Sequence, residues 1–233
     1  MSVLTLLLAG PLQSWGASSR FARRTTLNAP TKSGVIGLLA AARGIDREDD
    51  LQLARLASLR FGVRIDQPGT VVRDFQTAQH LKTGKAMPLS ERFYLADAVF
   101  VAAVEGDGAL LNELHAALAT PVYTPYLGRR SCPPGAPVEL EVRVGVGLEQ
   151  ALAEEPWRAS QWYQNRYGGG PATVTLLVEA SDGSGEDLQR DQPTSFRTSH
   201  RQHALRSVNR STMSVLPSCS VPAHDPFASF GDL

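Results

Sequence analysis

The first residues that could bind a ligand follow the apolar run at the start of the chain. Residues 4–9 are apolar apart from Thr5, and the run ends at Gly10-Pro11. A short apolar run with a sharp end is typical of a strand buried on both faces, and side chains at its exit are held rigidly enough to bind a ligand. We therefore predict a ligand site in the polar and aromatic cluster after this run. The cluster consists of Gln13, Ser14, Trp15 and Gly16.

A second candidate group, Lys32-Ser33, stands at the start of a predicted helix. It is similar to the end of a phosphate-binding P-loop, but that motif requires glycines where this chain has Thr26 and Thr31. We therefore reject a nucleotidase function. The free amides of a helix N-terminus beside a lysine and a serine still favour an anion such as a backbone phosphate.

The charge is neutral overall, with 23 basic and 23 acidic residues, but the two signs are unevenly distributed. Two segments are basic, and such patches can collect phosphates, although a solvated surface explains any single arginine in them. The first segment contains Arg20, Arg23, Arg24 and Lys32. The second contains Arg190, Arg197, His200, Arg201, His203, Arg206 and Arg210, with Asp191 as its single acid.

A long stretch without clear periodicity, residues 67–92, separates two predicted strands. Its apolar residues, among them Phe75, predict a projecting hairpin. Its basic residues are Arg73, His80, Lys82 and Lys85, against Asp74 alone. A basic arm with some apolar side chains suits insertion along or between nucleotides, because bases stack on such side chains. The alternative is an ordinary surface loop.

The elements that position these groups are predicted in the order strand, helix, strand, strand, helix, strand. The strands are 4–9, 61–65, 93–104 and 138–146, and the helices begin after Thr31 and at Asp107. This order is the α+β, ferredoxin-like (RRM-like) βαββαβ plan. Strand 93–104 lacks the paired aromatics and glycines of an RNA-recognition motif, so we expect Phe93, Tyr94 and Phe100 in the core.

We predict three regions in the chain. Residues 1–147 form the ferredoxin-like domain with its projection at 67–92, residues 148–216 form a smaller C-terminal extension that contains β-structure, and residues 217–233 form a flexible tail. The extension carries an aromatic group that fits either a packing segment or a partner surface, and we favour packing. The group consists of Trp157, Trp162, Tyr163 and Tyr167.

The composition is that of a globular chain. With 233 residues, 42% of them apolar, the chain can bury a core, and no apolar run is long enough to cross a bilayer. The N-terminus lacks the features of a signal peptide. Cys132 and Cys219 have no paired spacing, so we predict no disulfide, no zinc site and no cofactor. These features predict a cytoplasmic protein.

Four strings carry a resemblance to a known family. They are LAGPLQSWG, PTKSGVIGLLAAARGI, RDFQTAQ and TPYLGRRSCP, in this order between residues 8 and 133, and residues near Asp191 and Phe196 match the end of the same family. The chain closely resembles the Cas-five family of CRISPR-associated proteins, in the branch that supplies the CasD subunits of the type I-E surveillance complex Cascade.

The resemblance implies an RNA-binding subunit that performs no chemistry. Such subunits cap the 5′ handle of CRISPR RNA, project a thumb towards a backbone subunit and touch the large subunit that inspects target DNA. The thumb would be residues 67–92. The handle pocket would draw on Gln13, Ser14, Trp15, Gly16, Arg20, Arg23, Arg24, Lys32, Ser33, Arg129 and Arg130. Further RNA contacts are Arg73, His80, Lys82, Lys85, Arg197 and Arg201. Trp15 would either stack on a base of the handle or be buried in the hydrophobic core.

Two alternatives stay open. In type I-C relatives the corresponding subunit is a metal-independent endoribonuclease that cuts repeat RNA with a histidine, a lysine and a tyrosine. His80 and Lys82 keep that activity possible here, whereas no tyrosine occurs in residues 17–30 or in the arm before Tyr94. The second alternative is a generic single-stranded RNA binder acting alone, which would bind unrelated RNA as tightly as the handle.

Overall fold

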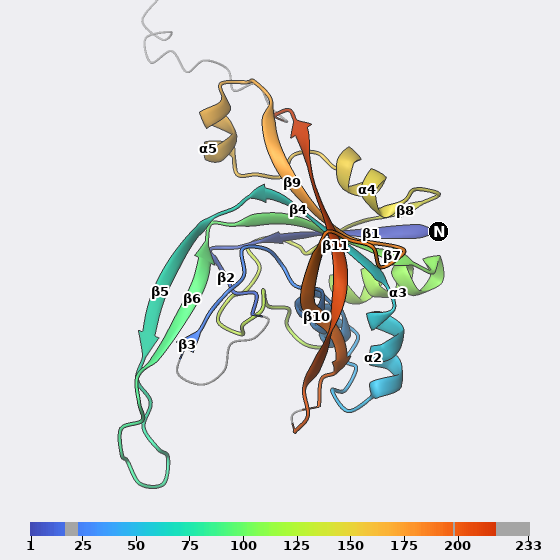
Figure 1. Cartoon of the computed structure of the whole chain (residues 1–233). Coiled ribbons are helices and arrows are strands. Elements are labelled where there is room, and N and C mark those ends of the chain that lie inside the picture. The colour runs from blue at the N-terminus through green and yellow to red at the C-terminus, as the bar shows by residue number, and fades with distance from the viewer. Residues whose placement is uncertain (17–22, 198, 218–233) are drawn as a thin grey trace, which may run out of the picture.

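The computed structural model describes residues 1–16, 23–197 and 199–217. A seven-stranded antiparallel sheet in the order β10-β11-β9-β4-β7-β1-β8 forms its centre (Figure 1). The strands are β1 (Ser2–Ala9), β4 (Arg60–Gln67), β7 (Val99–Gly106), β8 (Glu139–Val144), β9 (Ala172–Glu179), β10 (Asp187–Ser195) and β11 (Gln202–Val215). The predicted strands at the start of the chain, near residue 63 and near residue 140 therefore lie in one sheet.

Helices cover both faces of this sheet, which explains why its central strands are apolar on both sides. On β7, Phe100, Ala102 and Val104 pack in one core cluster with α1 and α3. The alternate residues Val101 and Ala103 pack in a second cluster with α4. The helices are α1 (Lys32–Ala42), α2 (Asp50–Ala57), α3 (Gly108–Ala119), α4 (Leu148–Glu154) and α5 (Gln161–Gln164), and a 3-10 turn follows at Asn165–Tyr167.

The starts of α1 and α3 agree with their sequence signals. The side chain of Asp107 accepts a hydrogen bond from Leu110 N at 3.0 Å, as predicted for a helix cap. Thr31 caps α1 in the same way, accepting from Gly34 N at 3.2 Å. Caps of this kind stabilise a helix by about 1 kcal/mol each.

The run predicted as one strand at 93–104 is divided between two sheets, so that prediction was wrong. The chain leaves β6 (Ser90–Ala96), turns through Asp97 with a positive φ of 55°, and enters β7 at Val99. Two buried amides hold this turn: Gln67 donates to Asp97 O at 2.5 Å and Gln13 donates to Ala98 O at 2.7 Å. Asp97 is the single charged residue between Ala96 and the buried Ala98, and one charged residue within an apolar run does not by itself indicate the end of a strand.

A second, smaller sheet forms a ribbon that projects from the main body (Figure 1). Strand β5 (Thr70–Gln76) pairs along its whole length with β6 in an antiparallel hairpin. Two short strands, β2 (Leu12–Gln13) and β3 (Arg23–Arg24), also pair with β6. We call β5, β6 and the connection 77–89 the β5–β6 ribbon.

The C-terminal strands extend the main sheet. Strand β9 pairs with β4, and β11 pairs with both β9 and β10. The β10–β11 hairpin contacts α1 and α2, and projects on the same side of the molecule as the β5–β6 ribbon (Figure 1). None of the described helices is long and apolar enough to span a membrane. The predicted tail beyond residue 217 lies outside the described residues.

Candidate functional site

The cluster after the first strand lies inside the protein. The Gln13 side chain donates to Leu8 O at 2.9 Å and to Ala98 O at 2.7 Å, and its oxygen accepts from Trp15 Nε1 at 3.0 Å. Trp15 is 1% exposed, and Ser14 Oγ donates to Phe93 O at 3.1 Å. Of the alternatives for Trp15, the structure shows the core position. Gln13, Ser14 and Trp15 therefore hold the site together, and Gly16 is the exposed member.

Trp15 connects the strand exit to two segments that carry predicted site residues. Its ring packs so closely on Gly34 of α1 that a Cβ at that glycine would lie 2.9 Å from it. Its backbone N donates to Thr26 Oγ1 at 2.9 Å, and its carbonyl accepts from Leu27 N at 2.7 Å. These bonds fix the chain after β3, so that Arg23 and Arg24 are presented from an anchored segment.

Residues 124–133, which we call the glycine loop, lie directly over the same strand exit. Ser14 N donates to Leu127 O at 3.1 Å, and Leu127 is buried. Gly128 has a φ of +85°, and a Cβ there would lie 1.8 Å from Ser14 O. Because only glycine fits this close approach, Gly128 lets the loop turn over Ser14 and present Arg129 and Arg130.

Arg129 is the centre of a cationic cluster at the base of the ribbon. Its Nη2 donates to Arg24 O at 2.8 Å, and its Cζ lies 4.7 Å from the centre of the Tyr94 ring. Arg129 Nη1 and Arg92 Nε are both buried without a hydrogen-bond partner in the described part of the chain. Arg130 is exposed and has no ion pair there. Guanidinium groups arranged in this way can donate hydrogen bonds to phosphate oxygens.

Tyr94 lies under this cluster and responds to its charge. Burial works to raise the pKa of Tyr94, but hydrogen bonds with Ser131 and Arg129 and the positive charge of Arg129 outweigh it, so the pKa is lowered. The prediction of Tyr94 as a core residue is confirmed, whereas Arg92 was not among the predicted site residues. Their spacing of two residues on β6 places them on one face of the strand, a signal that was available in the sequence.

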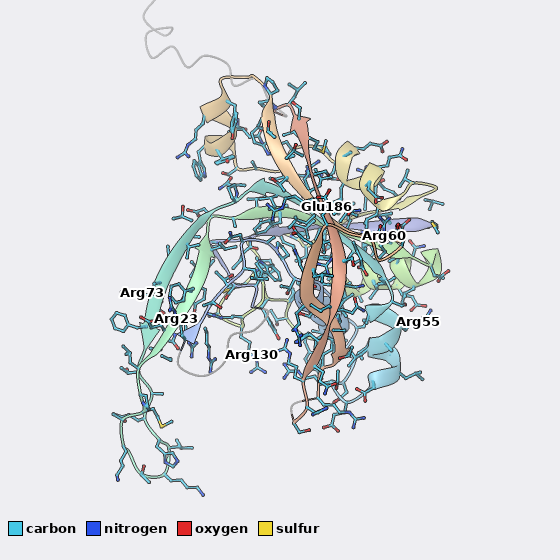
Figure 2. All side chains as sticks on the ribbon, in the orientation of Figure 1. Arg23, Arg55, Arg60, Arg73, Arg130 and Glu186 are labelled. Atoms are coloured by element: carbon cyan, nitrogen blue, oxygen red, sulfur yellow. The ribbon has the colours of Figure 1, made fainter. Side chains whose placement is uncertain are left out.

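The β5–β6 ribbon carries further arginines, partly neutralised by one carboxylate. Glu91 lies 3.2 Å from Arg73 and 3.9 Å from Arg23, and the guanidinium of Arg23 lies 5.3 Å from the centre of the Phe93 ring. In the view of Figure 2, Arg23 and Arg73 lie along the ribbon, and Arg130 lies between the ribbon and the β10–β11 hairpin. The ribbon thus forms one cationic side of the site.

The far end of the ribbon is exposed and carries both basic and apolar side chains. Lys82 and Lys85 are exposed, and His80 Nδ1 lies 3.3 Å from Thr83 N. Leu81 is fully exposed and Phe75 is 66% exposed. Apolar side chains of this kind next to cations remain available for contact with another molecule.

The predicted anion site at the start of α1 is occupied by a carboxylate side chain of the protein itself. Asp191 of β10 accepts from Lys32 N at 2.8 Å, and Lys32 Nζ lies 2.9 and 3.0 Å from the carboxylate oxygens of Glu179. Lys32 and Ser33 are buried. Burial lowers the pKa of Lys32 and outweighs the opposing effect of Glu179. A phosphate contact through Lys32 would require it to leave these carboxylates, so the prediction of an external phosphate here is not supported.

The second basic segment also has internal partners. Arg206 forms two hydrogen bonds with Asp191, at 2.6 and 3.0 Å, and lies against the Phe61 ring. Arg197 pairs with Asp50 at 2.7 Å. Arg201 is exposed and has no carboxylate partner among the described residues. Arg20 lies outside the described residues.

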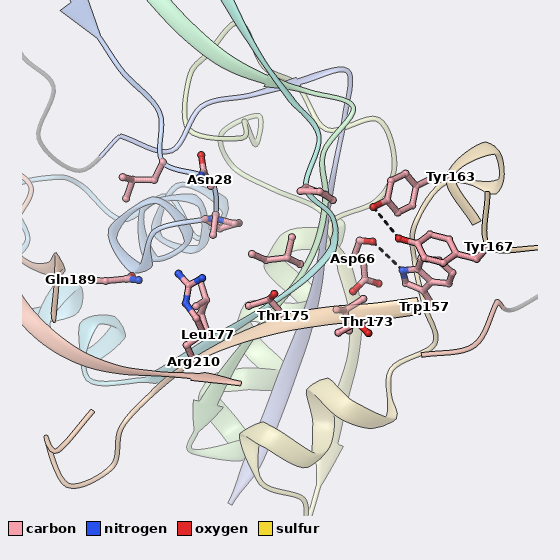
Figure 3. Close-up of a pocket in the computed structure, with 16 residues that line it drawn as sticks. Asn28, Asp66, Trp157, Tyr163, Tyr167, Thr173, Thr175, Leu177, Gln189 and Arg210 are labelled. Atoms are coloured by element: carbon pink, nitrogen blue, oxygen red, sulfur yellow. Dashed lines mark hydrogen bonds between the residues drawn. The ribbon is translucent and has the colours of Figure 1, made fainter. Parts of the chain in front are cut away.

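A separate groove of about 480 Å³ lies beside β9 (Figure 3). Trp157, Tyr163 and Tyr167 stand at one end, and Arg210 and Gln189 stand at the other. Burial, followed by the neighbouring Tyr167, raises the pKa of Tyr163 to about 12. None of the predicted RNA contacts lines this groove, so it is distinct from the site around Arg129. No cluster of potential metal ligands occurs among the described residues.

Comparisons with known proteins match most of this chain to CRISPR-associated proteins. Residues 3–209 match the family described as CRISPR-associated protein (Cas_Cas5). The CRISPR system Cascade subunit CasD of Escherichia coli (strain K12) is 39% identical over 170 residues, which cover 65% of this chain and 75% of that protein.

Two solved structures are similar in both sequence and fold. One, described as a crystal structure of a Cas protein, is 38% identical with a TM-score of 0.70, and the match covers 90% of this chain and 94% of that one. The other comes from a CRISPR RNA-guided surveillance complex and is 32% identical with a TM-score of 0.75, covering 96% of this chain and 95% of its counterpart. Both matches therefore cover nine tenths or more of this chain.

Proposed function

This chain belongs to the Cas-five family of CRISPR-associated proteins, and we propose that it is the CRISPR RNA-binding subunit of a type I-E Cascade complex, where it caps the 5′ handle. The observation that carries this function is the glycine loop, which is locked over Ser14 and presents Arg129 and Arg130 beside the projecting ribbon. The subunit supports recognition of foreign DNA by holding the guide RNA.

The central domain is ferredoxin-like in this proposal. Strands β4, β7, β1 and β8 are neighbours in this order, which corresponds to 2-3-1-4 for the four strands of a βαββαβ unit. Helices α1 and α3 pack in one cluster on the same face of these strands. Strands β9 to β11 form the C-terminal extension and lengthen the same sheet.

The β5–β6 ribbon is the thumb of the subunit. Its strands are paired from Thr70 to Gln76, so it can project without support from the main core. Exposed Leu81 and Phe75 at and near its end suit contact with an adjacent backbone subunit, and Lys82 and Lys85 suit the RNA between the two proteins.

The handle lies against the cations between the ribbon and the glycine loop. Guanidinium groups bind phosphates with paired, charge-assisted hydrogen bonds, which fix the position of the strand and make affinity strongly dependent on salt. The proposed contacts are Gly16, Arg20, Arg23, Arg24, Arg73, Arg92, Arg129 and Arg130. The buried residues Gln13, Ser14, Trp15, Lys32 and Ser33 position these contacts.

The subunit holds RNA without cutting it in this proposal. His80 and Lys82 lie in the exposed end of the ribbon, whereas Tyr94 is buried at the base of the same ribbon under Arg129. A histidine, a lysine and a tyrosine must converge on one phosphodiester for metal-independent cleavage. The separation of these residues supports a role in binding.

The proposed partners are the CRISPR RNA and two kinds of Cascade subunit. The backbone subunit meets the thumb, and the large subunit meets another face and brings the target DNA into indirect contact. We propose a cytoplasmic location, where CRISPR RNA is available, and no association with a membrane.

Incubation of the purified chain with its repeat-derived RNA tests binding and cleavage together. We expect the handle-containing RNA to be bound at least about tenfold more tightly than a scrambled RNA of the same composition, and to remain intact. Filter retention gives the affinities, and a denaturing gel shows the length of the 5′-labelled RNA.

Two outcomes would contradict the proposal. Equal affinity for the scrambled RNA would identify a generic single-stranded RNA binder. Cleavage at one position that disappears in His80→Ala would identify an endoribonuclease instead.

A further inference from the structure

The groove beside β9 has a floor formed by one face of the main sheet. Alternate side chains of a strand point to the same face, so Thr173, Thr175 and Leu177 of β9 lie together. Ile65 of β4 is paired with Thr175, and Arg210 of β11 is paired with Leu177, which places both on that face as well. All five residues line the groove, whose volume of about 480 Å³ is sufficient for a small molecule.

Three aromatic rings form one end of the groove (Figure 3). The centre of the Trp157 ring lies 5.3 Å from that of Tyr167 and 6.2 Å from that of Tyr163, and both contacts are edge-to-face. Trp157 is buried, whereas Tyr167 is exposed and Tyr163 is half-buried. Exposed tyrosine rings can stack with flat ring systems such as nucleic-acid bases.

The tyrosine hydroxyls at this end have hydrogen-bonding capacity left over. Tyr167 donates to Tyr163 across 3.5 Å, which is the limit of a hydrogen bond. Burial, followed by the neighbouring Tyr167, raises the pKa of Tyr163 to about 12, so this hydroxyl keeps its proton at neutral pH. It can therefore donate a hydrogen bond to a ligand.

A buried ion pair fixes the aromatic end to β4. The side chains of Arg64 and Asp66 are completely buried and lie 2.6 Å apart. Arg64 also donates to three main-chain oxygens within residues 152–156, and Trp157 Nε1 donates to Asp66 O at 3.0 Å. The segment that leads to the aromatic rings is thus held in one place before any ligand arrives, which reduces the entropy lost on binding.

The opposite end of the groove carries an available cation. Arg210 lies 3.8 Å from Asp187, and both side chains are more than half exposed, so this ion pair is weak. Asp66 is the only acidic residue among the described residues that line the groove, and it is paired with Arg64. Arg190 of the same hairpin is exposed too, but it does not line the groove. Arg210 is therefore the cation that an anion in the groove would meet.

We propose that this groove binds one nucleotide, with its base against Tyr163 and Tyr167 and its phosphate on Arg210. Only a ligand that joins a flat ring to an anion uses both ends of the groove. The floor runs from Thr173 to Leu177, about 13 Å of strand, which accommodates a nucleotide from its base to its phosphate. The threonine hydroxyls of the floor lie between the two ends and can form hydrogen bonds with the sugar.

The groove borders a segment that carries part of the proposed RNA site. Residues 27–30 line the groove, and Leu27 N donates to Trp15 O at 2.7 Å. Arg23 and Arg24 come shortly before them in the chain. The nucleotide can thus be a free molecule or a part of an RNA strand that continues past Arg24, since both present the same chemistry. None of the predicted handle contacts lines the groove, so this binding is separate from the proposed function.

Calorimetric titration of the purified chain with adenosine 5′-monophosphate and with adenosine tests the groove. We expect the monophosphate to bind about tenfold more tightly, because only its phosphate forms charge-assisted hydrogen bonds with Arg210. In Arg210→Ala this difference should disappear, while the affinity for adenosine stays unchanged. Arg190→Ala is the matched control, because it removes an exposed arginine of the same hairpin that does not line the groove.

A second pair of variants tests the aromatic end. Tyr167→Ala should weaken both ligands by about tenfold, because a base loses the ring on which it stacks. Tyr167→Phe keeps the ring and should keep most of the affinity. Thermal melts show whether Tyr167→Ala remains folded, and the exposed Arg210 gives an independent test if it does not.

Absence of saturable binding of the monophosphate to the folded chain would overturn the proposal, as would a tenfold difference between the ligands that persists in Arg210→Ala. Loss of nucleotide binding in Arg129→Ala/Arg130→Ala but not in Arg210→Ala would also overturn it, because the ligand would then lie at the site around Arg129. Displacement of the monophosphate by handle RNA would identify a nucleotide of an RNA strand as the natural occupant, whereas simultaneous binding would identify a free nucleotide, and either result supports the groove. Preference of the chain for the handle over scrambled RNA is measured separately, so failure of the groove and failure of the proposed function are distinguishable.

Discussion

Replacing Arg129 and Arg130 together by alanine is expected to weaken handle RNA binding about a hundredfold and to lower its salt slope by about 1.4. Each arginine is positioned to bind phosphate with charge-assisted hydrogen bonds, which contribute about 1.5 to 3 kcal/mol each. The exposed Arg130 should act through RNA contact alone. Arg129 also donates to Arg24 O and lies on the Tyr94 ring, so its loss should loosen the site as well.

Replacing the same two arginines by lysine tests whether RNA binding depends on their charge or on the shape of the guanidinium group. Arg129→Lys/Arg130→Lys keeps both charges, so the salt slope should remain. Affinity should fall by about tenfold, because lysine cannot form the two-pronged hydrogen bonds of a guanidinium with phosphate. Arg55→Ala, which removes an exposed arginine of helix α2, is the control for general loss of charge. Affinities measured by fluorescence anisotropy at several salt concentrations, with thermal melts of each variant, decide the outcome. Wild-type affinity in the alanine pair would show that the handle does not bind at the glycine loop.

The variant Gly128→Ala is expected to show the largest loss of stability, at least about 3 kcal/mol. Part of this comes from the φ of +85°, and a larger part from a Cβ that would lie 1.8 Å from Ser14 O. The loop must move away from Ser14, which breaks the hydrogen bond from Ser14 N to Leu127 O. For a chain of this size the melting temperature should fall by about 6 to 12 °C.

Gly145→Ala is the matched control for Gly128→Ala. Gly145 has a φ of +79°, but nothing lies within 4 Å of the Cβ that alanine would add. The cost should therefore be the conformational strain alone, about 1 kcal/mol, with unchanged RNA binding. Gly128→Ala should also lose RNA affinity, because Arg129 and Arg130 follow the displaced residue. Equal melting temperatures for the two variants would contradict the tight contact between the glycine loop and Ser14.

Local patterns in the sequence predicted the elements well, because their causes are local. Alternation along 61–65 and 138–146 predicted β4 and β8, and Asp107 caps α3 as its position indicated. The break between β6 and β7 was not predicted, because Asp97 alone interrupts the apolar residues there and the turn is held by the distant residues Gln13 and Gln67.

Several residues that the sequence predicted as ligand contacts have side chains that lie in the core. Gln13 and Trp15 look like ligand contacts in the sequence, yet their partners are core groups such as Ala98 O. Likewise, the helix start at Lys32 does favour an anion, but its anion is Asp191, 159 residues later in the chain. A sequence shows which residues could bind a charge, whereas only the fold shows which of them already have a partner.

The resemblance to a known family implied a thumb at 67–92 and a pocket with Arg129 and Arg130, but in the second basic segment it gave a role only to Arg197 and Arg201. Its arginines look equivalent in the sequence, with Asp191 as the single acid among them. The fold binds Arg206 to Asp191 and leaves Arg201 exposed without an ion pair among the described residues. That division depends on the packing of β10 against α1 and α2, which no local pattern contains.

Sequencing the RNA that copurifies with this subunit from cells tests the central claim most directly. A tagged copy of the chain, expressed with the other subunits of its complex, should retain RNA whose 5′ ends begin uniformly with the repeat-derived handle. Retention should fall in Arg129→Ala/Arg130→Ala and persist in Arg55→Ala. RNA with scattered 5′ ends, or a complex that assembles on the handle without this subunit, would contradict the account.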